Sequence, residues 1–408
     1  MNGALKHLRV LDMSRILAGP WAGQILADMG AEVIKVERPG SGDDTRAWGP
    51  PYARDAQGRE TPESAYFMSA NRGKKSIAVD IATPGGLEII RQLVRHCDVL
   101  LENFKVGGMS KYGLDYESLQ RINPGLVYCS ITGFGQTGPY AHRPGYDFAI
   151  QGMGGLMSIT GQPDDQPGGG PQKVGVALAD ISAGLYATIA ILAALVNRNE
   201  TGAGQYIDLA LLDVQLAVLA NQAMNYLVSG EAPQRLGNSH PNIVPYQSFA
   251  TANGHIVLAV GNDAQFRRYC LLAGDPGLAD DPRFISNRQR VENRGVLIRK
   301  LEKIMREKTS EEWLQLLETE NIPCAPINSI DKVFGNEQIR HRGMRLDMKH
   351  PAAGPISMVA NPIRFSATPN RYEQPPPLLG EHTRTILREL LELDENEIEA
   401  LTHAAVIR

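Results

Sequence analysis

The chain has few cysteines, and none of them stands in a spacing typical of disulfides or zinc ligands. Its four cysteines, Cys97, Cys129, Cys270 and Cys324, are scattered over 408 residues without a C-x-x-C pair. Secreted frameworks depend on paired cysteines, whereas scattered thiols are typical of a reducing compartment. We therefore expect neither a disulfide network nor a structural metal.

The sequence also lacks an excess of charge and a segment suited to a membrane. A formal net charge of -4 gives no general attraction to nucleic acid or anionic lipid, so we expect neither partner. No signal or transit segment precedes the first expected strand, which indicates a cytoplasmic protein. The longest apolar stretch, 181–196, is interrupted by Ser182, Gly184 and Thr188 and predicts a buried helix rather than a membrane span.

A dinucleotide fingerprint of the form G-x-G-x-x-G is missing as well. A strand at 8–13, a helix at 20–29 and a strand at 31–37 predict a βαβ unit, but the loop between the first two contains Ala18-Gly19-Pro20. Strands and helices continue to alternate to about residue 131, so we predict an α/β fold with a doubly wound parallel sheet. At this length a second, smaller domain is expected.

What the chain does have is a carboxylate in an unusual setting. Asp180 follows the apolar run 174–179 and precedes the apolar stretch 181–195. A carboxylate there is costly unless it is hydrogen-bonded, paired or used. The simplest interpretation is a helix N-cap. A cap also favours the ionised form, and an ionised, positioned carboxylate can act as a nucleophile that forms an acyl intermediate.

Basic side chains gather near the ends of the expected strands. Arg38 follows the strand 31–37, and Arg72, Lys74 and Lys75 precede a strand at 77–79. Ligands of open α/β sheets bind at strand ends, where such cations suit phosphates or carboxylates, although solvated surface is the simpler interpretation for lysine pairs. The remaining candidates are Arg46, Lys111, the glycine-rich segments 133–139 and 152–155, and Ser239 and His240 in a predicted loop.

Eight features together resemble a known enzyme family. They are, in order, Leu17-Ala18-Gly19-Pro20; 33–38 with Gly42-Asp43; 71–80; 98–104; 131–135; Asp180; 202–205; and 378–383. Their order and spacing are similar to those of class III CoA-transferases, which include formyl-CoA, carnitine and bile-acid CoA-transferases and alpha-methylacyl-CoA racemase. The resemblance covers essentially the whole chain. Segments 42–46, 244–247 and 375–380 are most similar to succinyl-CoA:dicarboxylate CoA-transferases of the glutarate and itaconate type.

The resemblance implies a domain arrangement. It implies a Rossmann-like large domain at 1–225 that binds coenzyme A, a small α+β domain at 226–335, and a C-terminal segment at 336–408 that returns to the large domain. It further implies a homodimer in which two chains interlock like links. The family has no metal or organic cofactor, and coenzyme A thioesters are its substrates.

Site residues carry over from the family position by position. Asp180 matches the catalytic aspartate. Lys111 stands where the formyl-CoA enzyme has arginine, which keeps the charge but loses the guanidinium fork. Positions that hold coenzyme A or line its site in the family match Ile16, Arg38, Arg72, Lys74, Lys75, Asn103 and Lys111.

One departure helps to choose between the branches of the family. The racemase branch has a His-Asp pair where this chain has Tyr146 and Asp147, so deprotonation and reprotonation at the α-carbon lose one base. We expect Tyr146 to line the substrate site instead. The segment 237–240 lies roughly where the formyl-CoA enzyme has gating glycines, and it contains only one glycine here. Three alternative functions stay open. They are racemisation or isomerisation of an acyl-CoA, CoA transfer to formate, oxalate, carnitine or bile acids, and non-catalytic binding of CoA.

The expected reaction is transfer of CoA from succinyl-CoA to a dicarboxylic acid such as glutarate or itaconate. Asp180 is expected to form a mixed anhydride and then an aspartyl-CoA thioester, with catalysis by positioning, backbone donors and exclusion of water. The distal carboxylate of the acceptor needs a cation, for which we predict Arg72, assisted by Ser239 and His240, with Arg46 in reserve. One methylene corresponds to about 1–3 kcal/mol of discrimination, so the sequence does not select among the acceptors.

Overall fold

A computed structural model describes residues 3–408, which divide by their internal contacts into two compact units. The first unit contains the described residues up to Leu156, then Val174–Ser229 and Gln338–Arg408. The second contains Met157–Lys173 and Gly230–Glu337. The domain boundaries drawn from the sequence stay a prediction. The units differ from them most at Met157–Lys173, which we had assigned to the large domain and which groups with the second unit.

Six parallel strands form the main sheet of the first unit, in the order β5-β2-β1-β6-β7-β8. The strands are β1 (Arg9–Asp12), β2 (Glu32–Glu37), β5 (Lys74–Ala78), β6 (Val99–Glu102), β7 (Val127–Thr132) and β8 (Tyr206–Ala210). All but β8 are almost wholly buried, as parallel strands are when both faces of the sheet are covered. The predicted α/β fold with a parallel sheet is therefore confirmed.

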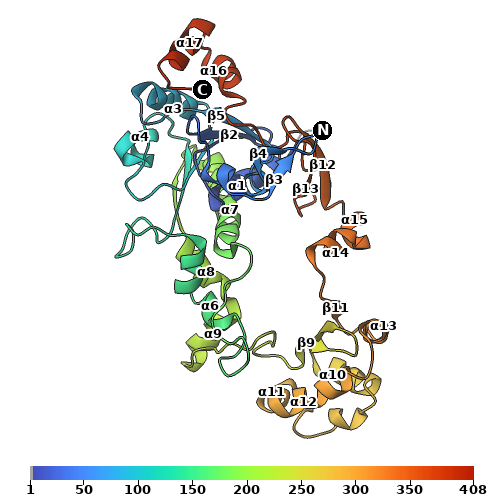
Figure 1. Cartoon of the computed structure of the whole chain (residues 1–408). Helices are drawn as coiled ribbons and strands as arrows, with labels where there is room; N and C mark the ends of the chain where they lie inside the picture. The colour runs from blue at the N-terminus through green and yellow to red at the C-terminus, as the bar shows by residue number, and fades with distance from the viewer. Residues whose placement is uncertain (1–2) are drawn as a thin grey trace. The chain divides into compact units, whose positions relative to one another are not determined.

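Helices cover both faces of this sheet (Figure 1). On one face α1 (Ala18–Asp28) packs against α7 (Leu178–Thr201), and their small and aliphatic side chains form one core. The longer helices of the other core are α3 (Pro84–Arg95), α16 (Thr383–Leu391) and α17 (Glu395–His403). The C-terminal segment thus packs beside elements from the start of the chain.

Helix α7 is the one helix in the described part of the chain that is long and apolar enough to cross a membrane. More than half of its most apolar window is buried inside the fold, because it packs on α1 and on the sheet. Its composition is therefore explained by its place in the core, as the sequence predicted. One side remains open, where Leu185, Ile189 and Val196 are 47%, 63% and 63% exposed.

Shorter elements complete the first unit. They are η1 (Asp44–Ala47), β3 (Tyr52–Arg54), β4 (Glu60–Ser64), α2 (Ala65–Ser69), η2 (Ser110–Tyr112), α4 (Tyr116–Leu119), α5 (Asp147–Met153), α8 (Leu211–Val218), α9 (Ala220–Ser229), β12 (Arg345–His350) and β13 (Gly354–Val359). Two more, α6 (Leu156–Ile159) and α15 (Glu337–His341), cross the divisions between the units.

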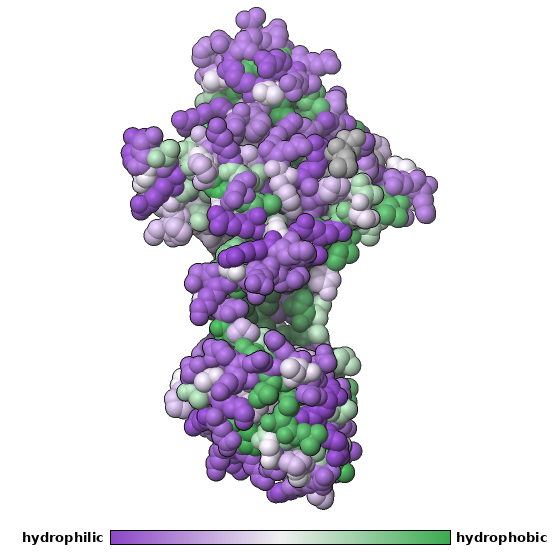
Figure 2. All heavy atoms as spheres, turned by 90° about the vertical axis from the view of Figure 1, so that its right-hand side faces the viewer, coloured by the Kyte–Doolittle hydropathy of each residue, from purple (hydrophilic) through white to green (hydrophobic). Residues whose placement is uncertain are grey.

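The second unit has a small antiparallel sheet of its own, in the order β11-β10-β9. Its core surrounds the fully buried side chains of Trp313, Phe266 and Phe284. Its elements are β9 (Tyr246–Ala250), β10 (His255–Ala259), α10 (Asp263–Leu272), η3 (Pro276–Ala279), α11 (Asn287–Glu292), α12 (Arg294–Met305), α13 (Ser310–Thr319), β11 (Cys324–Pro326) and α14 (Ile330–Gly335). Apolar side chains also reach the molecular surface, as the green areas of Figure 2 show.

Candidate active site

The strand order reverses between β1 and β6, and a cavity that contains Asp180 lies at the carboxyl ends of these two strands. The chain moves outward from β1 to β2, and later returns to place β6 on the other side of β1. Such a switch point is where open α/β sheets bind ligands. The cavity has a volume of about 400 Å³ and is lined by 15–18, 103–106, Gly108, Lys111, Tyr112, 131–133, 141–146, Asp180 and Leu211.

Asp180 lies in this cavity at the start of α7, but it is not the N-cap that the sequence predicted. The N-cap residue is Ala177, so Asp180 is in the first turn of the helix. Asp147 supplies the cap instead. Its Oδ1 accepts hydrogen bonds from the backbone N–H groups of Ala179 at 2.8 Å and of Asp180 at 3.4 Å. The Asp180 carboxylate itself therefore stays available for a substrate.

The environment of Asp180 disfavours its charge, contrary to the expectation that the helix start would hold it ionised. The residue is 8% exposed. Burial raises the pKa of Asp180 to about 7, and the nearby charge of Asp147 adds to this rise. Within residues 3–408 no group donates a hydrogen bond to the Asp180 carboxylate. A desolvated, poorly hydrogen-bonded carboxylate is a stronger nucleophile once it is ionised.

Asp147 is the site residue that the sequence analysis did not single out. It begins α5, and its Oδ2 accepts a hydrogen bond of 2.7 Å from Gln151 Nε2. Gln151 Oε1 in turn accepts from the N–H of Val174, so these side chains tie the segment before α7 to α5. In the sequence, the racemase comparison draws attention to Tyr146 and leaves Asp147 without a predicted role. An acidic residue just after a glycine-containing loop was the only sequence signal for its role.

The turn between β1 and α1 forms a second wall of the cavity. Ile16 has a φ of +70°, a left-handed conformation that costs a β-branched residue on the order of 1–3 kcal/mol. Asn103, at the end of β6, holds the neighbouring residue Arg15 through both of its backbone groups. Its Nδ2 donates to the Arg15 carbonyl at 2.7 Å and its Oδ1 accepts from the Arg15 N–H at 2.8 Å. The two strand ends are thereby joined.

A second cavity of about 390 Å³ continues along the same edge of the sheet. It shares Arg15, Phe104 and Tyr112 with the cavity of Asp180 and extends to Arg38 and Asp80 at the ends of β2 and β5. Arg38 is exposed there. The two cavities together can accept a long ligand with an anionic group at one end and its reacting group at the other.

A comparison with models of known protein families shows which family the chain belongs to. Residues 5–383 match the model of CoA-transferase family III. The chain belongs to CoA-transferase family III. The resemblance inferred from the sequence motifs is confirmed, and the protein is an enzyme that transfers coenzyme A.

Individual relatives and solved structures agree with this assignment. The chain is 53% identical over 386 residues to the succinate–glutarate CoA-transferase of Agrobacterium fabrum, and the match covers 95% of each. It is 47% identical over 403 residues to the succinyl-CoA:glutarate CoA-transferase of Mus musculus, covering 99% of this chain and 90% of the relative. The crystal structure of a CaiB/BaiF family protein from Brucella suis is similar with a TM-score of 0.82 at 50% identity, covering 96% and 100% of the two chains.

Four of the predicted site residues, three carried over from the family and one that departs from the racemases, line the Asp180 cavity of this CoA-transferase. These are Ile16, Asn103, Lys111 and Tyr146. Lys111 is exposed, and its Nζ lies 5.4 Å from the centre of the Tyr112 ring. Tyr146 is 62% exposed and is the N-cap residue of α5. The structure thus brings these four residues together with Asp180, and their contacts with coenzyme A stay a prediction.

Arg72 does not lie in the cavity of the transferase, contrary to our expectation for the distal carboxylate. Its side chain is 3% exposed, and the guanidinium binds both oxygens of Asp28, at 2.9 and 2.7 Å, and the carbonyl of Val359 at 2.9 Å. Burial raises the pKa of Asp28 despite these bonds. Arg72 is therefore committed to holding the residues around Val359 against α1, and it is not available to a substrate.

The other predicted cations are likewise engaged by the protein. Lys74 is fully buried, bound to Asp12 Oδ2 at 2.8 Å, and burial lowers its pKa to about 8. Lys75 forms a half-buried ion pair with Glu32 at 2.6 Å. Arg46 binds both oxygens of Glu37 at 2.8 Å. None of these three lysine and arginine side chains lines the Asp180 cavity.

Ser239 and His240 belong to the second unit of the transferase. Ser239 Oγ donates to Gln247 Oε1 at 2.9 Å, and His240 Nδ1 accepts from the N–H of Asn242 at 3.1 Å. Burial, and then the charge of Arg294, lower the pKa of His240. Their predicted part in substrate binding stays a prediction. In the described part of the chain no group of three or more His, Cys, Asp or Glu side chains could hold a metal ion.

Proposed function

We propose that this CoA-transferase moves coenzyme A from succinyl-CoA to glutarate, with the Asp180 carboxylate as the nucleophile. The observation that carries the proposal is the placement of this buried carboxylate at one end of two joined cavities, with Arg38 at the other. The names of the two relatives described above, at 53% and 47% identity, support the choice of donor and acceptor. Itaconate and other small dicarboxylates remain candidate acceptors under the same mechanism.

The proposed reaction proceeds by exchange of acyl groups and needs no redox step. The Asp180 carboxylate attacks the thioester carbonyl of succinyl-CoA, the C–S bond breaks, and CoA leaves as the thiolate. The thiolate then attacks the Asp180 carbonyl of the mixed anhydride, releasing succinate and leaving an aspartyl-CoA thioester. Glutarate repeats the two steps in reverse order, which yields glutaryl-CoA and the free carboxylate.

No proton has to move in these steps, because nucleophiles and leaving groups are all anions. The protein therefore contributes position, electrostatics and exclusion of water. Leu17, the N-cap residue of α1, and Ala18, its first residue, line the cavity, and the N-cap side chain makes no capping hydrogen bond. Backbone N–H groups at a helix start are suited to the oxyanion that forms on the thioester carbonyl.

Arg143 is the cation that we propose for the distal carboxylate, in place of Arg72. The segment 141–146 lines the Asp180 cavity but not the cavity that contains Arg38, so it lies away from the entry side of coenzyme A. Arg143 is exposed and stacks on the Tyr140 ring at 4.0 Å, and no acidic side chain among the described residues pairs with it. A free guanidinium suits a carboxylate.

Incubation with succinyl-CoA and a panel of carboxylic acids tests the function. Mass spectrometry of the new thioesters is expected to show glutaryl-CoA with the purified protein and none with the Asp180→Asn variant. Exchange of the α-proton of a branched acyl-CoA, without a new thioester, would instead support a racemase. Binding of CoA without either reaction would support a non-catalytic protein.

We also propose that the enzyme is a cytoplasmic homodimer. Apolar side chains stand open to solvent on α7 and on α9, where Leu227 and Val228 are 70% and 80% exposed. Open apolar faces of this kind are typical of subunit interfaces. Light scattering after size exclusion is expected to give twice the chain mass of 44.5 kDa, and the chain mass itself would contradict the proposal. The interlocked arrangement stays a prediction from the resemblance.

A further inference from the structure

The turn from Ser14 to Ile16 is fixed by side chains that come from four different places in the chain. Ser14 N–H donates to Asp12 Oδ1 at 3.0 Å, and the Ser14 carbonyl accepts from Lys35 Nζ at 2.9 Å. Arg15 is held by Asn103, as described above. The N–H of Ile16 donates to Asp43 Oδ1 at 3.2 Å. The surroundings thus specify the backbone of the one residue here that carries an unfavourable φ.

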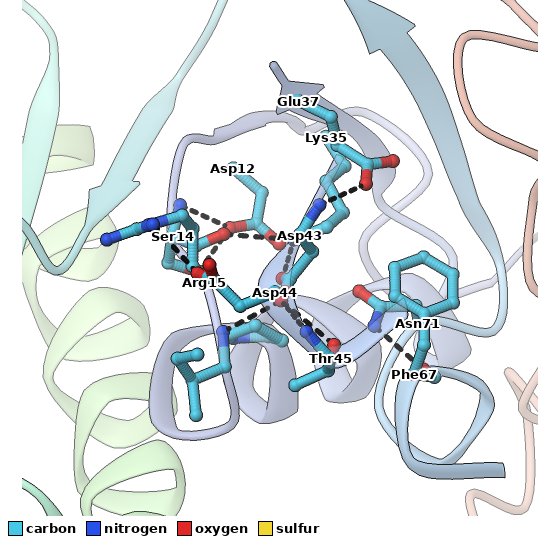
Figure 3. Close-up of polar contacts among 12 residues, drawn as sticks. Asp12, Ser14, Arg15, Lys35, Glu37, Asp43, Asp44, Thr45, Phe67 and Asn71 are labelled. Carbon is cyan, nitrogen blue, oxygen red and sulfur yellow. Dashed lines mark hydrogen bonds and ion pairs between the residues drawn. The ribbon is translucent and has the colours of Figure 1, made fainter. Parts of the chain in front are cut away.

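Asp43 is the centre of this arrangement (Figure 3). Its Oδ1 also accepts from the N–H and the Oγ1 of Thr45, at 3.0 and 2.8 Å, and its Oδ2 accepts from Lys35 Nζ at 2.9 Å. Its own N–H donates to Glu37 Oε2 at 3.0 Å. Through Lys35, which also binds Ser14, the carboxylate reaches the turn by two routes.

The ion pair between Lys35 and Asp43 is buried, so it holds the turn from Ser14 to Ile16 rigidly in place. Asp43 is 2% exposed and Lys35 is fully buried. Burial alone would raise the pKa of Asp43, but Lys35 and the hydrogen bonds from Thr45 lower it to about 2. Removing one member of such a pair leaves an uncompensated charge, so the pair resists local rearrangement.

We propose that Asp43, paired with Lys35, is a positioning residue of the transfer reaction that holds Ile16 in its left-handed conformation. Ile16 and the next two residues, Leu17 and Ala18, line the Asp180 cavity, so the conformation of Ile16 sets the direction in which α1 begins. Catalysis by position and backbone donors is sensitive to displacements of that wall. The inference rests only on CoA transfer in this cavity, whichever acid accepts the CoA.

The test removes the anchor without leaving a buried charge. In the two-site variant Lys35→Met with Asp43→Leu, kcat is expected to fall on the order of 100-fold. Lys35 and Asp43 also line the second cavity, so kcat, and not KM for the acyl-CoA, is the quantity compared. The milder Asp43→Asn variant keeps an acceptor for the Ile16 N–H and is expected to show an intermediate kcat. Glu32→Gln is the matched control. Glu32 lies on β2, the strand that carries Lys35, and forms ion pairs with Arg9 and Lys75, but it lies outside both cavities.

A glycine at position 16 separates positioning from general destabilisation. Glycine adopts positive φ without the penalty of isoleucine, so it needs no anchor. Ile16→Gly is expected to reduce kcat modestly by itself. The two-site variant, which we call the anchorless variant, is expected to lose much less kcat when it is combined with Ile16→Gly than when it is made in the wild-type protein. A loss that is equally large in both backgrounds overturns the proposal, as does an unchanged kcat in the anchorless variant.

The comparison remains decisive if one variant does not fold. Circular dichroism and thermal melting identify such a protein, and Asp43→Asn with and without Ile16→Gly then provides the same comparison. Each kcat is expressed as a ratio to the kcat of the protein without the Asp43 substitution, and it is measured with the acceptor that the wild-type protein uses best. If glutarate is not that acceptor, the proposed function is corrected while the ratios still test the role of Asp43.

Discussion

Asp147 caps the helix that carries Asp180 and at the same time raises the pKa of that residue. The Asp147 carboxylate accepts the N–H groups of Ala179 and Asp180 at 2.8 and 3.4 Å, and its charge adds to the effect of burial. Two carboxylates held this close cannot both be stabilised as anions by the same helix start. The arrangement fixes the position of the Asp180 backbone while it withholds stabilisation from the Asp180 anion.

The first prediction concerns the nucleophile. Asp180→Asn is expected to lower transfer from succinyl-CoA by at least about 10³-fold, because the amide cannot form the mixed anhydride. Wild-type protein treated with succinyl-CoA alone is expected to gain the mass of CoA less one water, because one Asp180 oxygen leaves with succinate, and the variant is not. The nucleophile assignment fails if the folded, purified variant still forms glutaryl-CoA at a comparable rate.

The second prediction concerns pH. In the proposed mechanism Asp180 reacts as the anion, and its pKa is raised to about 7. We therefore expect kcat/KM to rise with pH through about 7 and then level off. Asp147→Asn removes one cause of the raised pKa of Asp180, so the midpoint of the pH profile of kcat/KM is expected to move to lower pH. Asp115→Asn is the matched control, because Asp115 caps α4 outside both cavities. A midpoint that does not respond to Asp147→Asn contradicts the coupling.

The third prediction concerns stability. The folded state holds the Asp180 proton up to about pH 7, whereas an unperturbed aspartate releases it near 3.8. A raised folded pKa contributes stability below the unfolded pKa, and this contribution is lost as the pH rises through the folded value. Asp180→Asn is therefore expected to melt at a higher temperature than the wild type above pH 7, and the difference is expected to narrow on acidification. Melting curves that differ by the same amount at every pH would count against the raised pKa.

The sequence located a carboxylate in an apolar setting and the ligand-binding edge of the sheet, because both follow from local patterns. The role of Asp180 as the nucleophile came from the family resemblance and stays a prediction. Buried strands give near-continuous apolar runs, and an isolated aspartate inside such a run is visible without a structure. The N-cap interpretation was wrong because the true cap, Asp147, comes from a different helix, and a tertiary contact leaves no local signature. The left-handed φ of Ile16 was invisible for the same reason, since nothing in an isoleucine indicates it.

The assignment of Arg72 failed for a different physical reason. A cation near a strand end suits a ligand, but it equally suits a buried carboxylate, and the sequence does not reveal which partner the fold supplies. Here Asp28, which lies on α1, is that partner. Arg143 lies in no motif of the sequence that indicates a function. It became a candidate only when the structure showed that Arg143 lines the Asp180 cavity and that its guanidinium has no acidic partner among the described residues.

The fourth prediction follows from the Arg72 ion pair. Arg72→Leu is expected to lower the free energy of unfolding by about 3 kcal/mol, because it leaves Asp28 buried without its partner. Among the remaining folded molecules the ratio of kcat/KM for glutarate to that for its monomethyl ester is expected to stay unchanged. Thermal melting and this ratio together check the claim, and a selective loss for glutarate would restore Arg72 as a substrate residue.

The fifth prediction assigns the distal carboxylate to Arg143. Arg143→Leu removes charge-assisted hydrogen bonds worth about 1.5–3 kcal/mol, so kcat/KM for glutarate is expected to fall on the order of 10- to 100-fold. Monomethyl glutarate has the same length without the second charge, and its kcat/KM is expected to change little. Arg143→Lys keeps the charge but not the fork, and is expected to retain part of the preference. Equal losses of kcat/KM for both acceptors would contradict a contact between Arg143 and the distal carboxylate, because only such a contact distinguishes the acid from its ester.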